Sequence, residues 1–196
     1  MLLSGPAAMG GATVLLSTEH NYEDVRGAFS LSEDVQVPRG SYWFHDLWLS
    51  ASPPDRWFFR PSVTLRAGSF YDGWKTTLGT ETVWNLSRPL ELGGAYEVNL
   101  IRFGDRDQRL NTHLGRLRIQ AALNTHLSAT AFVQYNSVAD VFSLQTRIRY
   151  HFREGSDRWL VYNEGFNTDR HQSVGPTLPV TDSRVLLLKY TYTFIW

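Results

Sequence analysis

The chain has 196 residues, 19 basic and 19 acidic side chains, a formal net charge of zero and no cysteine. The lack of cysteine excludes disulfide scaffolds, thiolate metal sites and cysteine nucleophiles, and a neutral chain lacks the cationic surface that nucleic acid requires. Its 7 Trp, 9 Tyr and 11 Phe favour a strand-rich protein.

Apolar and polar residues alternate with a period of two along the chain, which predicts strands rather than helices. Turn signals such as those at 72–73 and 104–107 separate the alternating segments. No apolar run approaches the roughly 20 residues of a membrane-spanning helix. The expected strands, in chain order, are 11–18, 25–32, 42–51, 57–71, 75–86, 91–103, 112–123, 128–136, 141–152, 158–167 and 184–196.

The clearest alternation covers residues 141–152. One face of this segment carries Phe142, Leu144, Thr146, Ile148, Tyr150 and Phe152, and the other carries Ser143, Gln145, Arg147, Arg149 and His151. In a strand the two sets point in opposite directions, so one face meets an apolar medium and the other meets water. Both a soluble β-sandwich and a membrane barrel satisfy this pattern.

Strand length and the texture of the polar faces favour the membrane barrel. A membrane-crossing strand needs about 9–11 residues, and several segments are longer. The polar faces combine arginine and glutamine, as in a hydrated lumen. The expected lumen-facing residues are Arg116, Arg118, Gln134, Gln145, Arg147 and Arg149. Antiparallel hairpins with short loops are expected to pair Arg118 with Gln134, and Gln134 with Gln145.

Aromatic residues gather beside the predicted turns, where the two interfacial girdles of a membrane barrel would place them. They lie within 42–44, 57–59 and 70–74. The C-terminal residues Tyr190, Tyr192, Phe194 and Trp196 also alternate. This ending resembles the terminal-strand signal that bacterial outer-membrane barrels present to the barrel-insertion machinery, although phenylalanine is the commoner last residue.

Four further strings within roughly residues 40–196 resemble a Gram-negative outer-membrane barrel family. They are 68–73 (GSFYDG), 116–118 (RLR), 132–137 (FVQYNS) and 160–164 (LVYNE). In that family the barrel is the C-terminal part of a longer exported protein with an N-terminal domain like the family-nine carbohydrate-binding domains. Members are often labelled membrane-associated hydrolases. The resemblance implies a carbohydrate-related role and identifies no catalytic residue.

No catalytic residue, metal site or cofactor is expected. The six histidines form no zinc motif, and no nucleophile elbow or phosphate-binding loop occurs. Glu81 and Glu97 could face the lumen from adjacent strands, with Glu91 nearby, as glycoside hydrolysis requires. They are more simply counter-ions for the arginines. This favours a non-enzymatic role.

We therefore expect an all-β, antiparallel up-and-down transmembrane β-barrel. Residues 1–24 form an uncertain segment or partial strand, and residues 25–196 form the barrel module. Bacterial barrels have even strand numbers, so an odd count means either that one strand is miscounted or, the favoured interpretation, that the chain is the C-terminal portion of a larger barrel. With a periplasmic C-terminus, 104–111 and 167–183 become external loops.

The expected location is the bacterial outer membrane. Export to it requires a signal peptide, and because residues 1–17 lack the charge pattern of a signal peptide, we expect it upstream of this sequence. The module would anchor a larger exported protein and capture or pass a polar, saccharide-like solute. Outer-membrane lipid is its expected partner. Two alternatives remain open: a soluble secreted or periplasmic carbohydrate-binding β-sandwich and, less favoured, an outer-membrane hydrolase that would use Glu81, Glu97 and Glu164.

Overall fold

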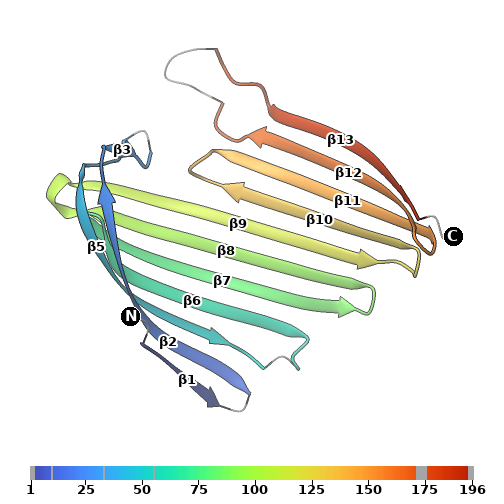
Figure 1. Ribbon diagram of the computed structural model, residues 1–196, viewed down its shortest axis with the longest axis horizontal. Coiled ribbons are helices and arrows are strands. Elements are labelled where there is room, and N and C mark those ends of the chain that lie inside the picture. The colour runs from blue at the N-terminus through green and yellow to red at the C-terminus, as the bar shows by residue number, and fades with distance from the viewer. Residues whose placement is uncertain (1–2, 10, 33, 55, 171–175, 194–196) are drawn as a thin grey trace. The chain divides into compact units, whose positions relative to one another are not determined.

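The computed structural model describes residues 3–9, 11–32, 34–54, 56–170 and 176–193, and these form an all-β protein (Figure 1). No α-helix occurs among them, and one 3-10 turn, η1, covers Gly104–Arg106. The strands are β1 (Leu3–Met9), β2 (Ala12–Val25), β3 (Phe29–Ser30), β4 (Gln36–Val37), β5 (Gly40–Ser52), β6 (Phe59–Phe70), β7 (Gly73–Ser87), β8 (Leu90–Phe103), β9 (Gln108–Ala122), β10 (Leu127–Asn136), β11 (Val141–Arg153), β12 (Ser156–Asn167) and β13 (Thr181–Tyr192).

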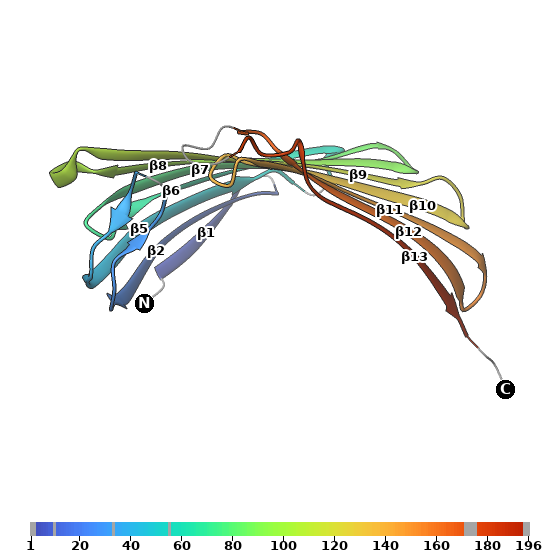
Figure 2. The ribbon, with the colours of Figure 1, turned by 90° about the horizontal axis from the view of Figure 1, so that it is seen from above.

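Eleven of these strands form one sheet in the order β1-β2-β5-β6-β7-β8-β9-β10-β11-β12-β13, while β3 and β4 pair only with each other. Every registered pair in the sheet is antiparallel. Figure 2 shows β10 to β13 side by side in chain order. The all-β class and the up-and-down antiparallel order are therefore confirmed. In this order β1 and β13 each have a single neighbour among the described strands.

The strands after residue 40 follow the predicted ones closely, whereas the N-terminal prediction needs correction. Residues 25–32 are not a strand of the sheet: β2 ends at Val25, and only 29–30 are extended, as β3. The predicted strand 11–18 is the first half of a longer one, and β1 was not predicted. The expected loop at 104–111 is shorter too, because β9 already begins at Gln108.

The chain divides into two compact units. Unit 1 comprises Met1–Thr82 and Ala95–His113, and unit 2 comprises Val83–Gly94 and Leu114–Trp196. In each unit, successive side chains of a strand point to opposite sides of the sheet, which creates an apolar face and a polar face. No helix in the described part of the chain has the length and apolar character to span a bilayer.

The apolar face of unit 2 has an aliphatic centre between two aromatic rows. Cross-strand pairing places Tyr135, Phe142 and Phe166 in one row. At the other end, the rings of Phe152 and Tyr190 lie 6.2 Å apart, centroid to centroid. Ala129, Ile148, Leu160 and Leu188 pair across the middle. The face's large exposed residues include Leu117, Ile119, Tyr135, Tyr150, Leu186, Leu188, Tyr190 and Tyr192.

The apolar face of unit 1 is equally exposed. It includes Leu16, Tyr22, Trp43, Leu47, Leu49, Val63, Leu65, Trp74, Leu78 and Tyr96. The rings of Tyr22 and Trp43 contact each other at 5.0 Å. Trp43, 61% exposed, and Trp74 lie near strand ends.

The only hydrophobic core in the described residues lies on the polar face of unit 1. The connection between β2 and β5, described at residues 26–32 and 34–39, folds back over this face. Its Val35 is 1% exposed and packs with Ile101 and with Phe103, which is also 1% exposed. Phe70 and Tyr71 pack against this cluster. We call residues 26–32 and 34–39 the covering segment.

The covering segment packs over four of the aromatic residues predicted for the interfacial girdles, so these four do not lie on the apolar face. Tyr42 and Phe44 share the parity of polar-face residues on β5, and both rings contact that of Tyr71 at 5.2 Å. Phe70 contacts Phe103 at 6.4 Å. These rings are packed beneath the covering segment instead of facing outward, because its apolar residues give them a partner.

Candidate functional site

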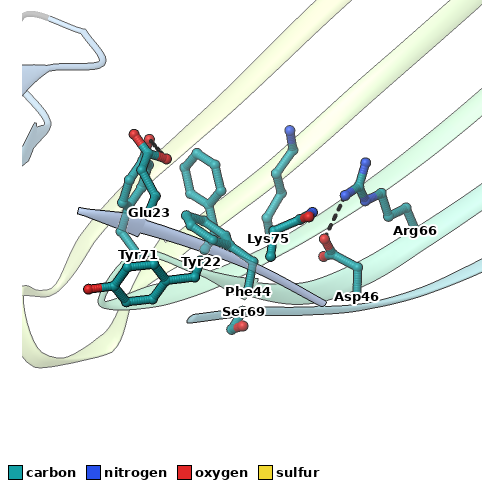
Figure 3. A pocket seen from close by; sticks show the side chains of 10 residues that line it. Tyr22, Glu23, Phe44, Asp46, Arg66, Ser69, Tyr71 and Lys75 are labelled. Carbon is teal, nitrogen blue, oxygen red and sulfur yellow. Dashed lines mark hydrogen bonds and ion pairs between the residues drawn. The ribbon is translucent and has the colours of Figure 1, made fainter. Parts of the chain in front are cut away.

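The polar face of unit 1 contains a depression of about 360 Å³ beside the covering segment (Figure 3). Arg66 on β6 reaches two carboxylates on neighbouring strands. Its Nη2 donates to Asp46 Oδ2 at 2.6 Å and to Glu19 Oε2 at 3.1 Å. The register that pairs Glu19 with Asp46 brings both acids to one side, so the charge of Arg66 is neutralised locally.

A second depression of about 340 Å³ in unit 1 extends this network to β7 and β8. Thr77 Oγ1 donates to Asn99 Oδ1 at 2.6 Å. Asn99 Nδ2 in turn donates to Glu97 Oε1 at 3.0 Å and to Thr112 Oγ1 at 3.1 Å. Lys75 lines this depression as well. The result is a hydrogen-bonded surface in which cations and carboxylates alternate, which suits contact with water.

Arg106 fastens the covering segment to the sheet. Its Nη2 donates to Asp72 Oδ1 at 2.8 Å, its Nη1 donates to the carbonyl oxygen of Gln36, and its guanidinium lies 4.4 Å from the centroid of the Phe103 ring. Gln108 Nε2 adds a bond to the carbonyl oxygen of Asp34 at 3.1 Å. The covering segment, the turn between β6 and β7, and the connection from β8 to β9 are thus joined at one end of the polar face.

Tyr71, in the turn between β6 and β7, adds a further link beneath the covering segment. Its hydroxyl donates to Glu23 Oε2 at 3.3 Å (Figure 3). Burial of the ring, followed by the charge of Glu23, raises the pKa of the Tyr71 phenol above its ordinary value. The phenol therefore stays protonated as a donor through the neutral pH range. Its backbone φ of 53° is left-handed, which is uncommon for a non-glycine residue.

Unit 2 has its own depression of about 290 Å³ on the polar face, which we call the arginine depression. It is lined by Arg118, Thr130, Phe132, Gln145, Thr146, Arg147, Val161 and Asn163. Three of the predicted lumen residues, Arg118, Gln145 and Arg147, are brought together here. No carboxylate is among the lining side chains; the nearest counter-ion, Glu91, contacts Arg118 at 2.7 Å from outside.

Arg149 lies on the same polar face but forms an ion pair with Asp157. Its Nε and Nη2 donate to the two carboxylate oxygens of Asp157 at 2.9 Å each. His151 Nδ1 lies 2.8 Å from the same carboxylate. Both Arg149 and Arg147 stand over the Trp159 ring, at 5.2 and 5.9 Å from its centroid. This tryptophan forms an aromatic floor for the two cations.

Arg116 and Gln134 lie directly opposite each other on β9 and β10, at the same face as the arginine depression but outside its lining. The expected pairs Arg118–Gln134 and Gln134–Gln145 are wrong by two residues. Phe132 pairs with Arg118 on one side and with Gln145 on the other. A slip of two leaves every side chain on its face, which is why the faces were right and the partners were not.

The residues expected to form the terminal insertion signal are described in part. Tyr190 and Tyr192 lie on the apolar face of β13, with their rings 6.3 Å apart, and both are exposed. Phe194 and Trp196 fall outside the described residues.

Three of the four carboxylates considered for hydrolysis have different hydrogen-bond or ion-pair partners. Glu97 belongs to the Asn99 network on the polar face of unit 1, and Glu91 pairs with Arg118. Glu164 lies on the apolar face of unit 2, where Arg184 Nε donates to it at 3.0 Å. Within the ranges that the structure describes, no group of three or more His, Asp or Glu is arranged to hold a metal ion.

Several site residues were not singled out from sequence. Asp46 and Arg66 share one face by the same alternation that identified Arg118 and Arg147, so the signal was present for these two. Glu19 lies beyond the predicted strand 11–18 and joins that face only because β2 extends to Val25. Phe132 and Trp159 carried no such signal, since apolar rings on a polar face contradict the pattern.

Comparison with protein-family models, with curated proteins and with solved structures finds no match to this chain.

Proposed function

We propose that the chain is an outer-membrane β-barrel module that anchors a larger exported protein. The observation that supports this most strongly is the exposure of the apolar face. Leu188 is 80% exposed, and the neighbouring large residues Leu186 and Tyr190 are exposed as well. Exposed apolar surface of this extent calls for an apolar partner, and acyl chains provide one along a whole sheet face.

The spacing of the aromatic rows supports the same function. Phe142 and Phe152 are ten residues apart on β11, or about 33 Å along the strand at ~3.3 Å per residue. A strand tilt near 40° reduces this to about 25 Å, the height of the apolar band of a membrane barrel. The ten sheet strands from β2 to β13 have 10–15 residues each, enough to cross that band.

The polar faces would then line a hydrated interior, and the module would capture or pass a polar, saccharide-like solute. Its partners would be outer-membrane lipid and the machinery that inserts barrels. Strands beyond the eleven of this sheet would complete the barrel, making it a portion of a larger one. An antiparallel barrel closes only when its first and last strands run in opposite directions, which requires an even number.

Extraction and refolding test the proposal. The full chain, expressed with an export signal, should sediment with outer membranes and require detergent for solubility. In detergent it should migrate faster on a gel before heating than after. A soluble carbohydrate-binding sandwich would instead stay monomeric in buffer without detergent, and that result would overturn the proposal. Polysaccharide or lipid hydrolysis lost in E81A, E97A or E164A would favour the hydrolase alternative.

A further inference from the structure

The arginine depression of unit 2 differs chemically from the depressions of unit 1. Arg118, Arg147, Gln145, Asn163 and Thr130 line it, and each can donate a hydrogen bond. None of its lining groups is a carboxylate. A concave surface made of cations and amides, with no acid, favours an anionic occupant.

Arg147 is the residue that most requires an external partner. Among the described residues no carboxylate lies within ion-pair distance of its guanidinium. Its guanidinium lies 5.9 Å from the centroid of the Trp159 ring. Its cross-strand neighbours are Thr130 and Val161, neither of which bears charge. Its five N–H donors are therefore available to a ligand in the depression.

Arg118 faces the same depression from β9, on the other side of Phe132. One of its amino groups is held by Glu91, which fixes the side chain and leaves the rest of the fork facing the cavity. Gln145 and Asn163 lie directly opposite each other on β11 and β12. Two guanidinium groups and two amides thus line one depression together with the Phe132 ring, an arrangement that can hold an oxyanion while its carbon skeleton rests on Phe132.

Unit 1 supplies the contrast that makes this specific. There Arg66 is clamped between Asp46 and Glu19, and Lys75 shares its depression with Glu97. Arg66 is neutralised by two acids of the same face, and Lys75 has carboxylates among the residues of both depressions that it lines. The anionic preference therefore belongs to the arginine depression and is not a general property of the polar faces.

We infer that the arginine depression binds a solute that carries an oxyanion group, such as a carboxylate or sulfate. This inference rests on the proposed function, because it specifies the class of solute that the hydrated face would capture or pass. An acidic saccharide combines this group with hydroxyls that Gln145 and Asn163 can bond. A simple inorganic oxyanion has the group alone.

Titration calorimetry of the full chain in detergent tests this, with sodium sulfate, sodium glucuronate and glucose as probes at constant ionic strength. Sulfate and glucuronate should bind and glucose should not. R147Q should weaken both by about tenfold or more, since a charge-assisted hydrogen bond is lost. R147K should lose less than R147Q. R158Q is the matched control, because it removes the same charge from β12 on the apolar face.

Tighter binding of glucuronate than of sulfate would support the inference with a saccharide as the source; equal binding would support it with the oxyanion alone. Absence of anion binding, equal binding of glucose, or equal losses in R147Q and R158Q would overturn it. Circular dichroism of each variant separates these results from misfolding. If the chain proves soluble without detergent, the membrane proposal fails, yet the same titration in buffer still decides the anion site.

Discussion

Leu188 offers the sharpest test of the membrane-facing surface. It lies on β13 in the cross-strand row with Leu160 and Ile148, between the two aromatic rows of unit 2. Residue 147 is midway between Phe142 and Phe152, so Ile148 and its row are within one residue of the expected bilayer midplane. The neighbouring Leu187 points to the polar face and is also exposed, at 54% against 80%.

Leu188→Arg should destabilise the folded chain in a bilayer by about 2–4 kcal/mol, the cost of an arginine on the lipid face of a barrel near the midplane. Leu187→Arg introduces the same side chain into the hydrated face. Its main cost is repulsion from Lys189, roughly 0.5 kcal/mol in water. The difference between the two variants is therefore expected to reach at least about 1.5 kcal/mol.

Equilibrium denaturation in phosphatidylcholine vesicles, followed by tryptophan fluorescence, measures both variants under identical conditions. The reasoning predicts a large loss for L188R and a small one for L187R. In a sheet surrounded by water both arginines would be solvated, and the two variants would behave alike. Equal stability of L188R and L187R, or a greater loss in L187R, would refute the assignment of the apolar face to lipid.

Three further perturbations test the packing. Val35→Asp places an unpaired carboxylate in the core under the covering segment. Trypsin should then cleave after Arg26 and Arg39 faster, while the sheet signal in circular dichroism persists. Unchanged cleavage would contradict the packing. Gly68→Ala should destabilise the folded chain by about 1–3 kcal/mol, because the added Cβ meets the backbone of β5. The Cβ of Gly79→Ala meets nothing closer than 3.8 Å, so this variant should keep its stability. Equal shifts of the two urea midpoints would count against this packing. Glu164→Gln and Arg184→Gln should each lower the urea midpoint of unfolding, because each breaks the ion pair. The double variant should lose less stability than the two single variants lose together. Strictly additive losses would mean that the two residues are not coupled.

The strands of the C-terminal half could be predicted because their signals are local. The alternation and the turn residues on either side predict a strand at 141–152 without reference to any other part of the chain, and β11 covers Val141–Arg153. The same holds for β10, predicted at 128–136 and found at Leu127–Asn136. Period and turn chemistry suffice wherever a strand is long and one face is apolar.

The covering segment could not be predicted, because its burial depends on residues remote in sequence. Val35 is 1% exposed, yet its partners in the core cluster, Ile101 and Phe103, follow more than 60 positions later. In a local window, 25–32 reads as one more alternating strand. Only the return of the chain over the polar face distinguishes it, and alternation contains no information about that return.

The arginine depression was predictable in its charges and not in its shape. Arg118, Gln145 and Arg147 follow from strand parity alone. Their arrangement around Phe132 depends on the register, and registers that differ by two residues are equivalent to the hydrophobic pattern. Asn163 enters the site through the pairing of β11 with β12, which the pattern also leaves undetermined.

Glu164 and Arg184 are charged residues on the apolar face, so they test whether that face is consistent with a membrane. Glu164 is 7% exposed on that face, and Arg184, the Tyr162 hydroxyl and Thr181 Oγ1 all donate to it. The pair lies one cross-strand row inside the row of Phe142 and Phe166, about 5 Å along the membrane normal at the expected tilt. Near an interface the cost of a charge falls to about 0–1 kcal/mol, and the long side chain of arginine can extend toward the headgroups. The charges thus occupy a depth that a bilayer tolerates, whereas the same pair in the row of Leu188 would contradict the proposal.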